Sequence, residues 1–506
     1  MQLQGQQVLV IGLGTSGLAM ARWCAAAGAS VTVLDDRAAP PQAAPLAQEL
    51  PHVRLVHGAL DASALTLGDF TRICVSPGLA PARLARLLEA ARAAHVPVGS
   101  ELDIFTHALA ELEAQHQYTP AVIAITGTNG KTTVTALTGQ LVQRAGKTVV
   151  VAGNIGPSLL DSLAQACQAQ TLPQVWVLEL SSFQLHYSEG FAPTVATVLN
   201  LSQDHLDWHT DMADYAQAKA RIFGPDTLMV LNREDAAVMA MLPAPVRAKL
   251  QKPQERAHLC FGADEPQRAG DYGLQDLGGM LWLVRAAPAD ETLKGKRAGG
   301  VQEDLFLQKL MPADALRIHG QHNACNALAA LALASAVGCA LGPMLFGLRE
   351  YRGEPHRVQS LGTVAEVEYF DDSKGTNVGA TLAALHGMGA QRRLVLILGG
   401  QGKGQDFGPL AHPVARYARA VVLIGTDAPA LRAALAPSQV PLHDASTMQE
   451  AVAQAAALAQ PGDAVLMSPA CASLDMFRDY SHRAQVFADA VATLAADAGT
   501  VLEAFA

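Results

Sequence analysis

Short runs of consecutive apolar residues, each followed by a glycine-rich or polar turn, recur along this chain of 506 residues. Residues 8–11, 121–125 and 394–398 are three of these runs. A strand without polar alternation must be covered on both faces, as in a parallel sheet between two layers of helices. Because helical stretches alternate with these runs, the sequence predicts an α/β fold built on doubly wound sheets.

The apolar runs group into three units, and the length is about three times the ~150 residues of a common domain. We expect a Rossmann-like N-terminal domain at 1–108, a central domain at 109–353 and a C-terminal Rossmann-like α/β domain at 354–506. The order of the units along the chain therefore predicts three α/β domains in series.

Two segments of the central unit differ from this pattern. Residues 320–348 are mostly Ala and Leu but include His and Asn, so we expect one buried helix there and no membrane span. Residues 251–316 show weak periodicity, and the polar, Gly- and Lys-rich stretch 291–303 predicts an exposed loop within them.

The composition excludes several classes of protein. Lys and Arg number 36 against 46 Asp and Glu, and the net charge of −10 argues against sequence-independent binding to nucleic acids or anionic membranes. The seven cysteines are scattered and form no CxxC pair, which is typical of reduced cytosolic thiols. No basic and apolar leader opens the chain, so we expect a cytoplasmic enzyme that binds no nucleic acid and does not insert into a membrane.

Gly12, Gly14 and Gly17 follow the first apolar run and precede a helix, which is the spacing of a dinucleotide-type phosphate turn. Glycines let the backbone approach a phosphate, and the helix N-terminus offers N–H groups to it. Asp35 or Asp36, at the end of the next strand, could accept a hydrogen bond from a ribose hydroxyl. The alternative is a glycine turn that only packs the helix on the sheet, and the pattern does not select one nucleotide.

Residues 126–133, TGTNGKTT, lie between a buried strand and a helix and predict a P-loop-type phosphate cradle in a central ATPase domain. In this cradle Lys131 would reach the β- and γ-phosphate oxygens, and the hydroxyl of Thr132 would bind Mg²⁺. The loop differs from the general P-loop motif GxxxxGK at one position, because Ile125 stands where that motif has its first glycine.

Three further side chains of the central unit have both a functional and an ordinary explanation. Glu179 ends a strand, where a second acidic ligand of an ATP-bound metal often lies, but such a glutamate is also common in a solvated turn. His205 follows the next strand at the same sheet edge, or it is a surface histidine. Lys219 lies in a helical stretch, where spacing alone predicts a solvated lysine.

A polar cluster opens the Ala-rich stretch that follows, with His322, Asn323 and Asn326 close together. Two asparagines three residues apart lie on one face of a helix and suit an adenine edge. The alternative is a group of helix-capping residues.

Three strand ends in the last third each offer a hydroxyl or an ammonium group, in residues 371–377, 399–403 and 468–475. Each of them alone could be an ordinary turn. Carboxyl ends of parallel strands meet at one sheet edge, so jointly they predict a pocket that receives an anion.

In its motifs the chain resembles the Mur ligase family, the ATP-dependent amide-bond ligases of peptidoglycan precursor synthesis, over nearly its whole length. The motifs are, in chain order, ITGTNGKTT, LELSSFQL, DHLD, GQHNACNALAALALA, PHRVQ, DDSKGTNVGAT, GGQGKG and SPACASLDMF. The last four are most similar to the member that adds D-glutamate to UDP-N-acetylmuramoyl-L-alanine. Sister ligases usually carry a tyrosine-alanine-type motif where DDSKGTN stands here.

The resemblance implies a role for each matching position. The UDP substrate is expected to contact Thr15, Ser16, Asp35, Asp36, Arg37, Ser76, Gly78, Asn154 and His205. ATP is expected to contact Gly127, Thr128, Asn129, Gly130, Lys131, Thr132, Thr133, Asn326, Arg357 and Asp372. D-glutamate is expected to contact Lys374, Thr376, Lys403, Ser473, Leu474 and Tyr480, the last standing where the family has an aromatic contact.

The resemblance also implies the cofactors and the chemistry. Two Mg²⁺ sites are expected, with metal ligands from Thr132, Glu179, His205 and Lys219, the last as a carbamate, and the catalytic residues would be Lys131, Glu179, His205 and Lys219. A carbamate is an anionic oxygen ligand, whereas a bare ammonium would repel Mg²⁺. The substrate carboxylate would attack ATP to form an acyl phosphate, which the D-glutamate amine would then attack. We expect a monomer.

Other functions account for fewer of the motifs. An NAD-dependent oxidoreductase would use the first glycine turn but not the GTNGKTT loop. A nucleotide-binding regulatory protein without turnover would not need Lys374 and Lys403. Within the family, a sister ligase or a folate polyglutamate ligase is the nearest alternative.

Overall fold

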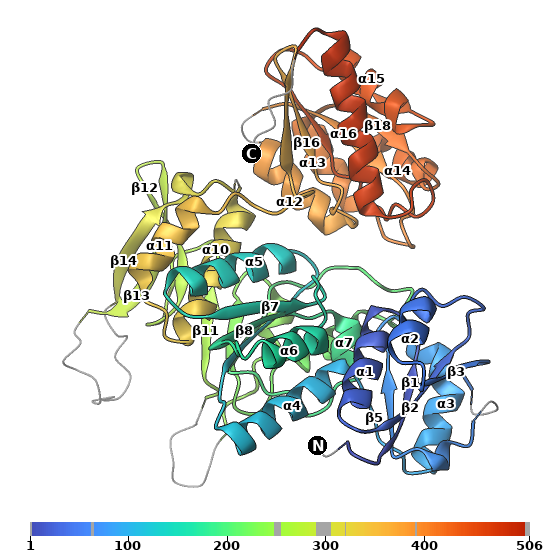
Figure 1. Cartoon of the computed structure of the whole chain (residues 1–506). Helices are drawn as coiled ribbons and strands as arrows, with labels where there is room; N and C mark the ends of the chain where they lie inside the picture. Colours follow the sequence, from blue (N-terminus) through green and yellow to red (C-terminus); the bar gives the residue numbers. More distant parts are fainter. Residues whose placement is uncertain are drawn as a thin grey trace.

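The computed structural model describes residues 3–61, 65–246, 255–289, 305–318, 320–389 and 392–500. They form three sheets that follow one another along the chain and are covered by helices (Figure 1). The N-terminal domain lies at the lower right of that view, the central domain beside it and the C-terminal domain above both. The predicted α/β class is confirmed.

The first sheet has the strand order β3-β2-β1-β4-β5, and its strands pair in parallel. Its strands are β1 (Gln7–Ile11), β2 (Ser30–Asp35), β3 (Arg54–His57), β4 (Arg72–Val75) and β5 (Val98–Gly99). The helices of this domain are α1 (Thr15–Ala26), α2 (Ala43–Glu49) and α3 (Pro81–Ala93). The glycine turn and the end of β4 therefore lie at the same sheet edge.

The second sheet has the order β14-β13-β12-β11-β10-β9-β6-β8-β7, parallel from β7 to β12 and antiparallel beyond. Its strands are β6 (Ala121–Thr126), β7 (Val149–Gly153), β8 (Val175–Glu179), β9 (Val195–Val198), β10 (Leu228–Asn232), β11 (His258–Phe261), β12 (Tyr272–Leu277), β13 (Met280–Pro288) and β14 (Leu305–Pro312). The accompanying helices are α4 (Glu101–His116), α5 (Lys131–Arg144), α6 (Leu159–Gln168), α7 (Ser182–His186), α8 (Met212–Ala220), α9 (Ala236–Met239), α10 (Gln321–Ala336) and α11 (Leu341–Glu350).

Both faces of β6 are apolar because each packs on a different layer of helices. Ile123 and Ile125 belong to the core formed with α5, α10 and α11, and Val122 and Ala124 belong to the core formed with α4 and α6. Trp176, fully buried on β8, packs edge-on against Phe105 of α4. The continuous apolar runs in the sequence are explained by this two-sided burial.

The third sheet has the order β15-β16-β20-β17-β18-β19, with β15 antiparallel to β16 and the other pairs parallel. Its strands are β15 (Gln359–Val364), β16 (Val367–Asp371), β17 (Leu394–Gly399), β18 (Ala418–Ile424), β19 (Leu442–Asp444) and β20 (Ala464–Met467). Helices α15 (Met448–Leu458) and α16 (Tyr480–Asp497) cover one face, and α12 (Val378–Gly389), α13 (Ala411–Tyr417) and α14 (Ala428–Leu435) cover the other.

The prediction of one helix over 320–348 was wrong. The chain forms α10 and α11 instead, and between them Gly338 has φ of +79°, a left-handed conformation that ends a helix. Both helices belong to the core of the central domain. None of the helices in the part of the chain that the structure describes combines the length and the apolar character that crossing a membrane requires.

The weakly periodic segment 251–316 contributes the strands β11 to β14 to the edge of the second sheet. Strands β13 and β14 pair as an antiparallel ribbon beyond β12. The expected exposed loop at 291–303 lies outside the described residues.

Helix α4 connects the first sheet to the second. Its residue Glu101 accepts a hydrogen bond from the backbone N–H of Leu160 (3.1 Å), and Asp103 accepts one from the hydroxyl of Ser188 (3.0 Å). The expected boundary at residue 108 falls inside this helix, so the division into 1–108, 109–353 and 354–506 stays a prediction.

The contact of α1 with the glycine turn gives a stability prediction. A Cβ atom at Gly17 would lie 2.0 Å from the carbonyl oxygen of Gly12, so Gly17→Ala must push α1 away from β1. We expect a loss of about 1–3 kcal/mol in stability, the usual cost of overpacking a close contact, visible as a lower melting temperature. The control is Gly68→Ala, where a Cβ meets no atom of the described residues within 4 Å. Equal melting temperatures for the two variants would contradict the prediction.

Candidate active site

The loop between β6 and α5 has the geometry of a phosphate cradle. Gly127 has φ of +155°, and a Cβ atom there would lie 2.9 Å from Cβ of Leu199. Gly130 has φ of +82° at the start of α5, where a Cβ atom would lie 2.8 Å from Oδ1 of Asn326. Glycine fits both positions, so the loop can turn tightly and direct the N-terminus of α5 toward an anion.

Lys131, the first residue of α5, folds back over this loop. Its ammonium donates hydrogen bonds to the carbonyl oxygens of Gly127 and Thr128, each at 2.9 Å. Burial lowers the pKa of Lys131, and the nearby carboxylates of Glu179 and Asp204 act in the opposite direction. The cation is therefore held at the loop, where an incoming phosphate would provide stronger acceptors.

Glu179 ends β8 beside the loop and is almost fully buried, at 2% exposure. Its Oε1 accepts a hydrogen bond from the side-chain amide of Asn154 (2.8 Å), whereas Oε2 is buried without a hydrogen-bond partner among the described residues. A buried carboxylate oxygen without a partner is costly unless a cation occupies the space in front of it. The donor set thus fits Mg²⁺, and the alternative of a solvated turn residue was wrong.

The prediction from spacing that Lys219 is solvated was also wrong. This residue of α8 is 1% exposed, and its ammonium donates to the carbonyl oxygen of Gly127 (2.9 Å) and the hydroxyl of Thr126 (3.2 Å). The ammonium also lies 4.6 Å from the ring centre of Tyr215. Burial, reinforced by the charge of Lys131, holds the pKa of Lys219 well below its usual range.

His205 lies near the charged groups of Lys131 and Lys219. Its backbone is left-handed, with φ of +56°. Its ring packs edge-on against Phe183 (4.8 Å between ring centres), and its Nε2 lies 3.6 Å from Oδ2 of Asp204. Burial lowers the pKa of His205 to about 4, against the opposing effect of Asp204, and the cations of Lys403, Lys131 and Lys219 lower it further. The imidazole is therefore neutral near pH 7 and able to act as a ligand.

The C-terminal domain contacts the phosphate loop directly. The Arg357 guanidinium donates to the hydroxyl of Thr132 at 2.6 Å. Asn377 and Asn129 exchange two amide hydrogen bonds, at 3.1 and 3.2 Å, and Asn377 also donates to Asp204 at 3.1 Å. Neither Asn377 nor Asp204 was predicted as a site residue, although both lie inside motifs noted in the sequence.

A cavity of about 290 Å³ lies at this junction of the central and C-terminal domains. The predicted ATP residues that line it are Asn129, Gly130, Thr133, Asn326, Arg357 and Asp372. Asn326 donates to Asn323 at 3.1 Å, and helix α10 begins after Gly320 without a side-chain cap, so the two asparagines face the cavity instead of capping the helix. Burial raises the pKa of Asp372 to about 7, although Ser468 donates to it at 2.6 Å.

In the N-terminal domain the carboxylate of Asp35 organises the glycine turn. It accepts a hydrogen bond from the backbone N–H of Leu13 (2.7 Å) and two from the Arg37 guanidinium (2.6 and 2.8 Å). Burial opposes ionisation, but these bonds prevail and lower the pKa of Asp35 to about 2. Asp36 is paired with Arg83 instead.

The other residues predicted for the UDP substrate lie on either side of this turn. A Cβ atom on Gly12 would meet Ser76 at 3.0 Å and Leu79 at 2.9 Å, so the segment with Ser76 and Gly78 lies against the glycine turn. Thr15 and Ser16 open α1 at the same place. The hydroxyl of Tyr187, in the central domain, donates to the carbonyl oxygen of Leu79 (2.8 Å) and ties this segment to α7. Asn154 is exposed beside Glu179.

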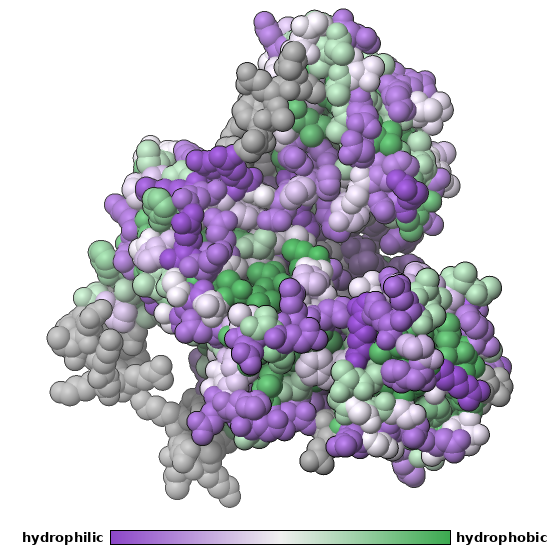
Figure 2. Space-filling view, in the orientation of Figure 1, coloured by the Kyte–Doolittle hydropathy of each residue, from purple (hydrophilic) through white to green (hydrophobic). Residues whose placement is uncertain are grey.

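The loops that end β16, β20 and β17 lie next to one another, because these strands are neighbours in the third sheet. The ammonium of Lys374 lies 3.8 Å above the ring centre of Tyr480. Lys403 has φ of +52° after β17 and contributes to the electrostatic surroundings of His205 in the central domain. Ser473 is buried and Leu474 is 65% exposed. In the space-filling view the surface is hollowed between the C-terminal and N-terminal domains (Figure 2).

Arg483 of α16 joins two of these loops and was missed by the sequence analysis. Its side chain is fully buried and donates to the carbonyl oxygens of Ser373 (2.8 Å) and Cys471 (3.1 Å). The carbonyl of Ser373 directly precedes Lys374, and the carbonyl of Cys471 lies two residues before Ser473. Burial lowers the pKa of Arg483 to about 10. Arg483 lies six residues after the end of the SPACASLDMF motif, and no local pattern indicates this role.

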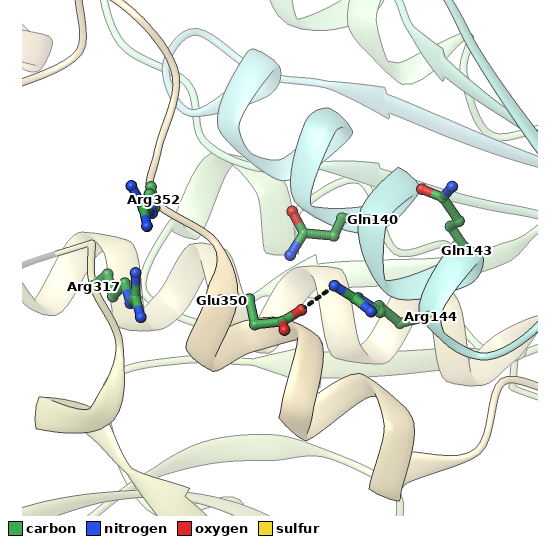
Figure 3. Close-up of a pocket in the computed structure, with 6 residues that line it drawn as sticks. All are labelled: Gln140, Gln143, Arg144, Arg317, Glu350 and Arg352. Carbon is green, nitrogen blue, oxygen red and sulfur yellow. Dashed lines mark ion pairs between the residues drawn. The ribbon is translucent and has the colours of Figure 1, made fainter. Parts of the chain in front are cut away.

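A second cavity, of about 740 Å³, lies on the outer side of α5 (Figure 3). It is lined by Gln140, Gln143, Arg144, Arg317, Glu350 and Arg352, and Arg144 forms an ion pair with Glu350. These residues include no predicted site residue, so the candidate active site is the junction of the phosphate loop with the C-terminal domain.

Comparison with known proteins agrees with this geometry. Three family profiles match the chain: a MurD-like N-terminal domain of Mur ligases at residues 6–100, a Mur ligase middle domain at 125–334 and a Mur ligase glutamate ligase domain at 356–471. A UDP-N-acetylmuramoylalanine–D-glutamate ligase of Albidiferax ferrireducens is 64% identical over 501 residues, covering 99% of both chains. A ligase of the same name from Polaromonas is 55% identical and covers 99% of this chain and 100% of its own.

Solved structures share the fold at low identity. The MurF ligase of Thermotoga maritima, in complex with ADP, has a TM-score of 0.57 at 14% identity and covers 98% of this chain and 96% of its own. The UDP-N-acetylmuramate–alanine ligase of the same organism has a TM-score of 0.55 at 18% identity and covers 96% of this chain and 99% of its own. Together with the full-length relatives, these matches show that the chain belongs to the Mur ligase family.

Proposed function

We propose that this chain joins D-glutamate to UDP-N-acetylmuramoyl-L-alanine in an ATP-dependent reaction of peptidoglycan precursor synthesis. One observation carries the proposal: Arg357 and Asn377 of the C-terminal domain bond directly to the phosphate loop. These bonds bring the three anion-binding loops of the third sheet to the site where a phosphoryl group would be transferred. The names of the full-length relatives support the same substrates.

ATP is proposed to bind with its phosphates on the loop from Gly127 to Thr133 and its adenine toward Asn323 and Asn326 in the junction cavity. Lys131 would exchange its two carbonyl contacts for phosphate oxygens. Mg²⁺, when bound, neutralises charge on the transferring phosphoryl group. Glu179, Thr132, His205 and a modified Lys219 are the residues proposed to hold it, and two ions would use this donor set.

The UDP part of the other substrate is proposed to lie on the glycine turn of the N-terminal domain. Asp35 holds the Leu13 N–H and Arg37 in place there, and the segment with Ser76 and Gly78 flanks them. The muramoyl arm would extend past Asn154 to His205, so that the L-alanyl carboxylate reaches the γ-phosphate. Holding reactants in line in this way can contribute about 7–11 kcal/mol to catalysis.

D-glutamate is proposed to bind between the three loops of the C-terminal domain. Its two carboxylates would face Lys374 and Lys403, with Thr376 and Ser473 as hydroxyl donors. Tyr480 holds the Lys374 ammonium by a cation–π contact, which fixes the direction of the lysine. The neutral amine would then attack the acyl phosphate, and the tetrahedral intermediate would release phosphate and the amide.

Lys219 is proposed to be carbamylated. The ammonium groups of Lys131, which is partly buried, and Lys219, which is buried, both bond to the carbonyl of Gly127, which is unfavourable for two like charges. Addition of CO₂ to the neutral amine of Lys219 would form an N–C bond and release one N–H proton to solvent, so that an anionic oxygen ligand replaces one cation. The cytoplasmic location and the monomeric state stay predictions.

The proposed substrate is tested by a panel of amino acids assayed for phosphate release with ATP and UDP-N-acetylmuramoyl-L-alanine. We expect the highest kcat/KM with D-glutamate, because two carboxylates are needed to pair with Lys374 and Lys403. Lys131→Ala should lower the rate by roughly 10²–10³-fold, as for loss of a group that stabilises transition-state charge. The exposed Lys309→Ala is the control. Highest activity with L-alanine, a diamino acid or a folate substrate would contradict the assignment.

The carbamate is tested by ¹³C NMR of the protein equilibrated with ¹³CO₂. Because burial lowers the pKa of Lys219, its amine is neutral at a lower pH than that of an ordinary lysine, so the carbamate should persist to a lower pH than on an exposed lysine and disappear as the amine becomes protonated. The signal should be absent from Lys219→Arg and unchanged in Lys147→Arg. An identical spectrum for the first variant would overturn the proposal.

The role of Arg483 as a positioning residue is tested through D-glutamate kinetics. In Arg483→Lys a single ammonium replaces the guanidinium that donates to the carbonyl oxygens of both Ser373 and Cys471. The two loops therefore lose the side chain that joins them. We expect the KM for D-glutamate to rise about tenfold or more while the KM for ATP changes less than twofold. Exposed Arg478→Lys, on the same side of the last motif, should leave both values unchanged. Equal changes in both KM values would show only a general loss of structure.

A further inference from the structure

Two histidines and an aspartate form a cluster on α7 and at the start of α8, beside the active site. They are His186, His209 and Asp214, and each offers a ligand atom that lies within 4.8 Å of the other two. His186 ends α7, His209 precedes α8 and Asp214 lies in its first turn. None of the roles proposed for the ligase reaction uses these three side chains.

The surroundings of His209 leave one ring nitrogen suited to a metal. Its side chain is fully buried, with Nδ1 3.0 Å from Oδ2 of Asp214 and Nε2 3.0 Å from the hydroxyl of Ser182. A hydroxyl both donates and accepts, so Ser182 can accept the Nε2 proton and leave Nδ1 unprotonated. A cation can then replace the proton between Nδ1 and the carboxylate, with the outer hydrogen bond fixing the tautomer.

His186 has one ring nitrogen that no hydrogen bond from the described residues occupies. Its Nδ1 is buried without a hydrogen-bond partner among the described residues. Burial lowers the pKa values of both His186 and His209, which keeps the two imidazoles in the neutral form that binds metals. Arg221 lies nearby, but its guanidinium bonds to the backbone carbonyl of His186 and so is directed at the main chain.

The donor set selects the class of ion. Two imidazoles and one carboxylate suit Zn²⁺ and similar transition ions, whereas Mg²⁺ prefers oxygen ligands. Tetrahedral coordination at about 2.0–2.2 Å places ligand atoms roughly 3.4 Å apart, so the cluster needs only a small closing movement of side chains. Three protein ligands leave a fourth position for water.

We propose that His186, His209 and Asp214 form a binding site for a divalent transition ion of the zinc class that ties α7 to α8. The ion would join the helix that precedes Tyr187, which contacts Leu79 of the N-terminal domain, to the helix that carries Lys219. The site is separate from the proposed Mg²⁺ ligands, and its occupancy does not depend on the proposed substrates.

The experiment uses the full chain with Mg²⁺ and a non-hydrolysable ATP analogue in excess, so that the active site is filled before Zn²⁺ or Co²⁺ is added. Isothermal titration gives the number of Zn²⁺ bound, and Co²⁺ reports imidazole ligation through its visible absorption. We expect wild type to bind one more equivalent than His186→Ala, and Asp214→Asn to bind that ion at least tenfold more weakly. Asn at 214 retains a hydrogen-bonding group for His209, so this variant is expected to fold.

His52→Ala is the matched control, because His52 is exposed in the N-terminal domain. It should bind Zn²⁺ as wild type does, and all variants should melt at wild-type temperature in the absence of Zn²⁺. The same stoichiometry and affinity in wild type, His186→Ala and Asp214→Asn would overturn the proposal, as would a Co²⁺ spectrum that is unchanged in both variants.

Discussion

The balance of charge around the carbonyl of Gly127 is the constraint on which the active site depends. Lys131 and Lys219 both donate to this oxygen at 2.9 Å, and Glu179 and Asp204 are the carboxylates that act on both of them. Transferring these lysine and carboxylate charges from water into the protein costs free energy unless each charge is paired with an opposite one. The arrangement is therefore suited to a reaction that brings anionic phosphates and Mg²⁺ into the same space.

The contacts between domains extend this site beyond the central sheet. The amide pair of Asn129 with Asn377 is specific in geometry and carries no net charge, whereas Arg357 brings a cation to Thr132 at the start of α5. Because the first residues of α5 belong to the loop proposed to hold the ATP phosphates, these few bonds would couple ATP binding to the position of the C-terminal domain. Such coupling would align the amino-acid site proposed on the C-terminal domain with the phosphoryl donor proposed on the central one.

Much of the fold and part of the site could be predicted from local patterns. The apolar runs predict the central strands because burial on both faces leaves no polar alternation, as at Ile123 and Val122. The loop of Gly127 to Thr133 is predictable because glycines and a following lysine are needed wherever backbone and phosphate approach closely. The break between α10 and α11 was not predictable in the same way, since Gly338 is a single glycine in a stretch whose composition favours helix throughout.

The sequence by itself determined the three α/β units, the glycine turns and the order of the motifs, because these depend on backbone conformation and on neighbours along the chain. Only the tertiary structure decided that Lys219 is buried beside Lys131, that Glu179 keeps one carboxylate oxygen without a hydrogen bond from the described part of the chain, and that Arg483 holds two loops together. The environment of a polar side chain is set by elements far away in the sequence that pack around it, and no local pattern records which elements those are.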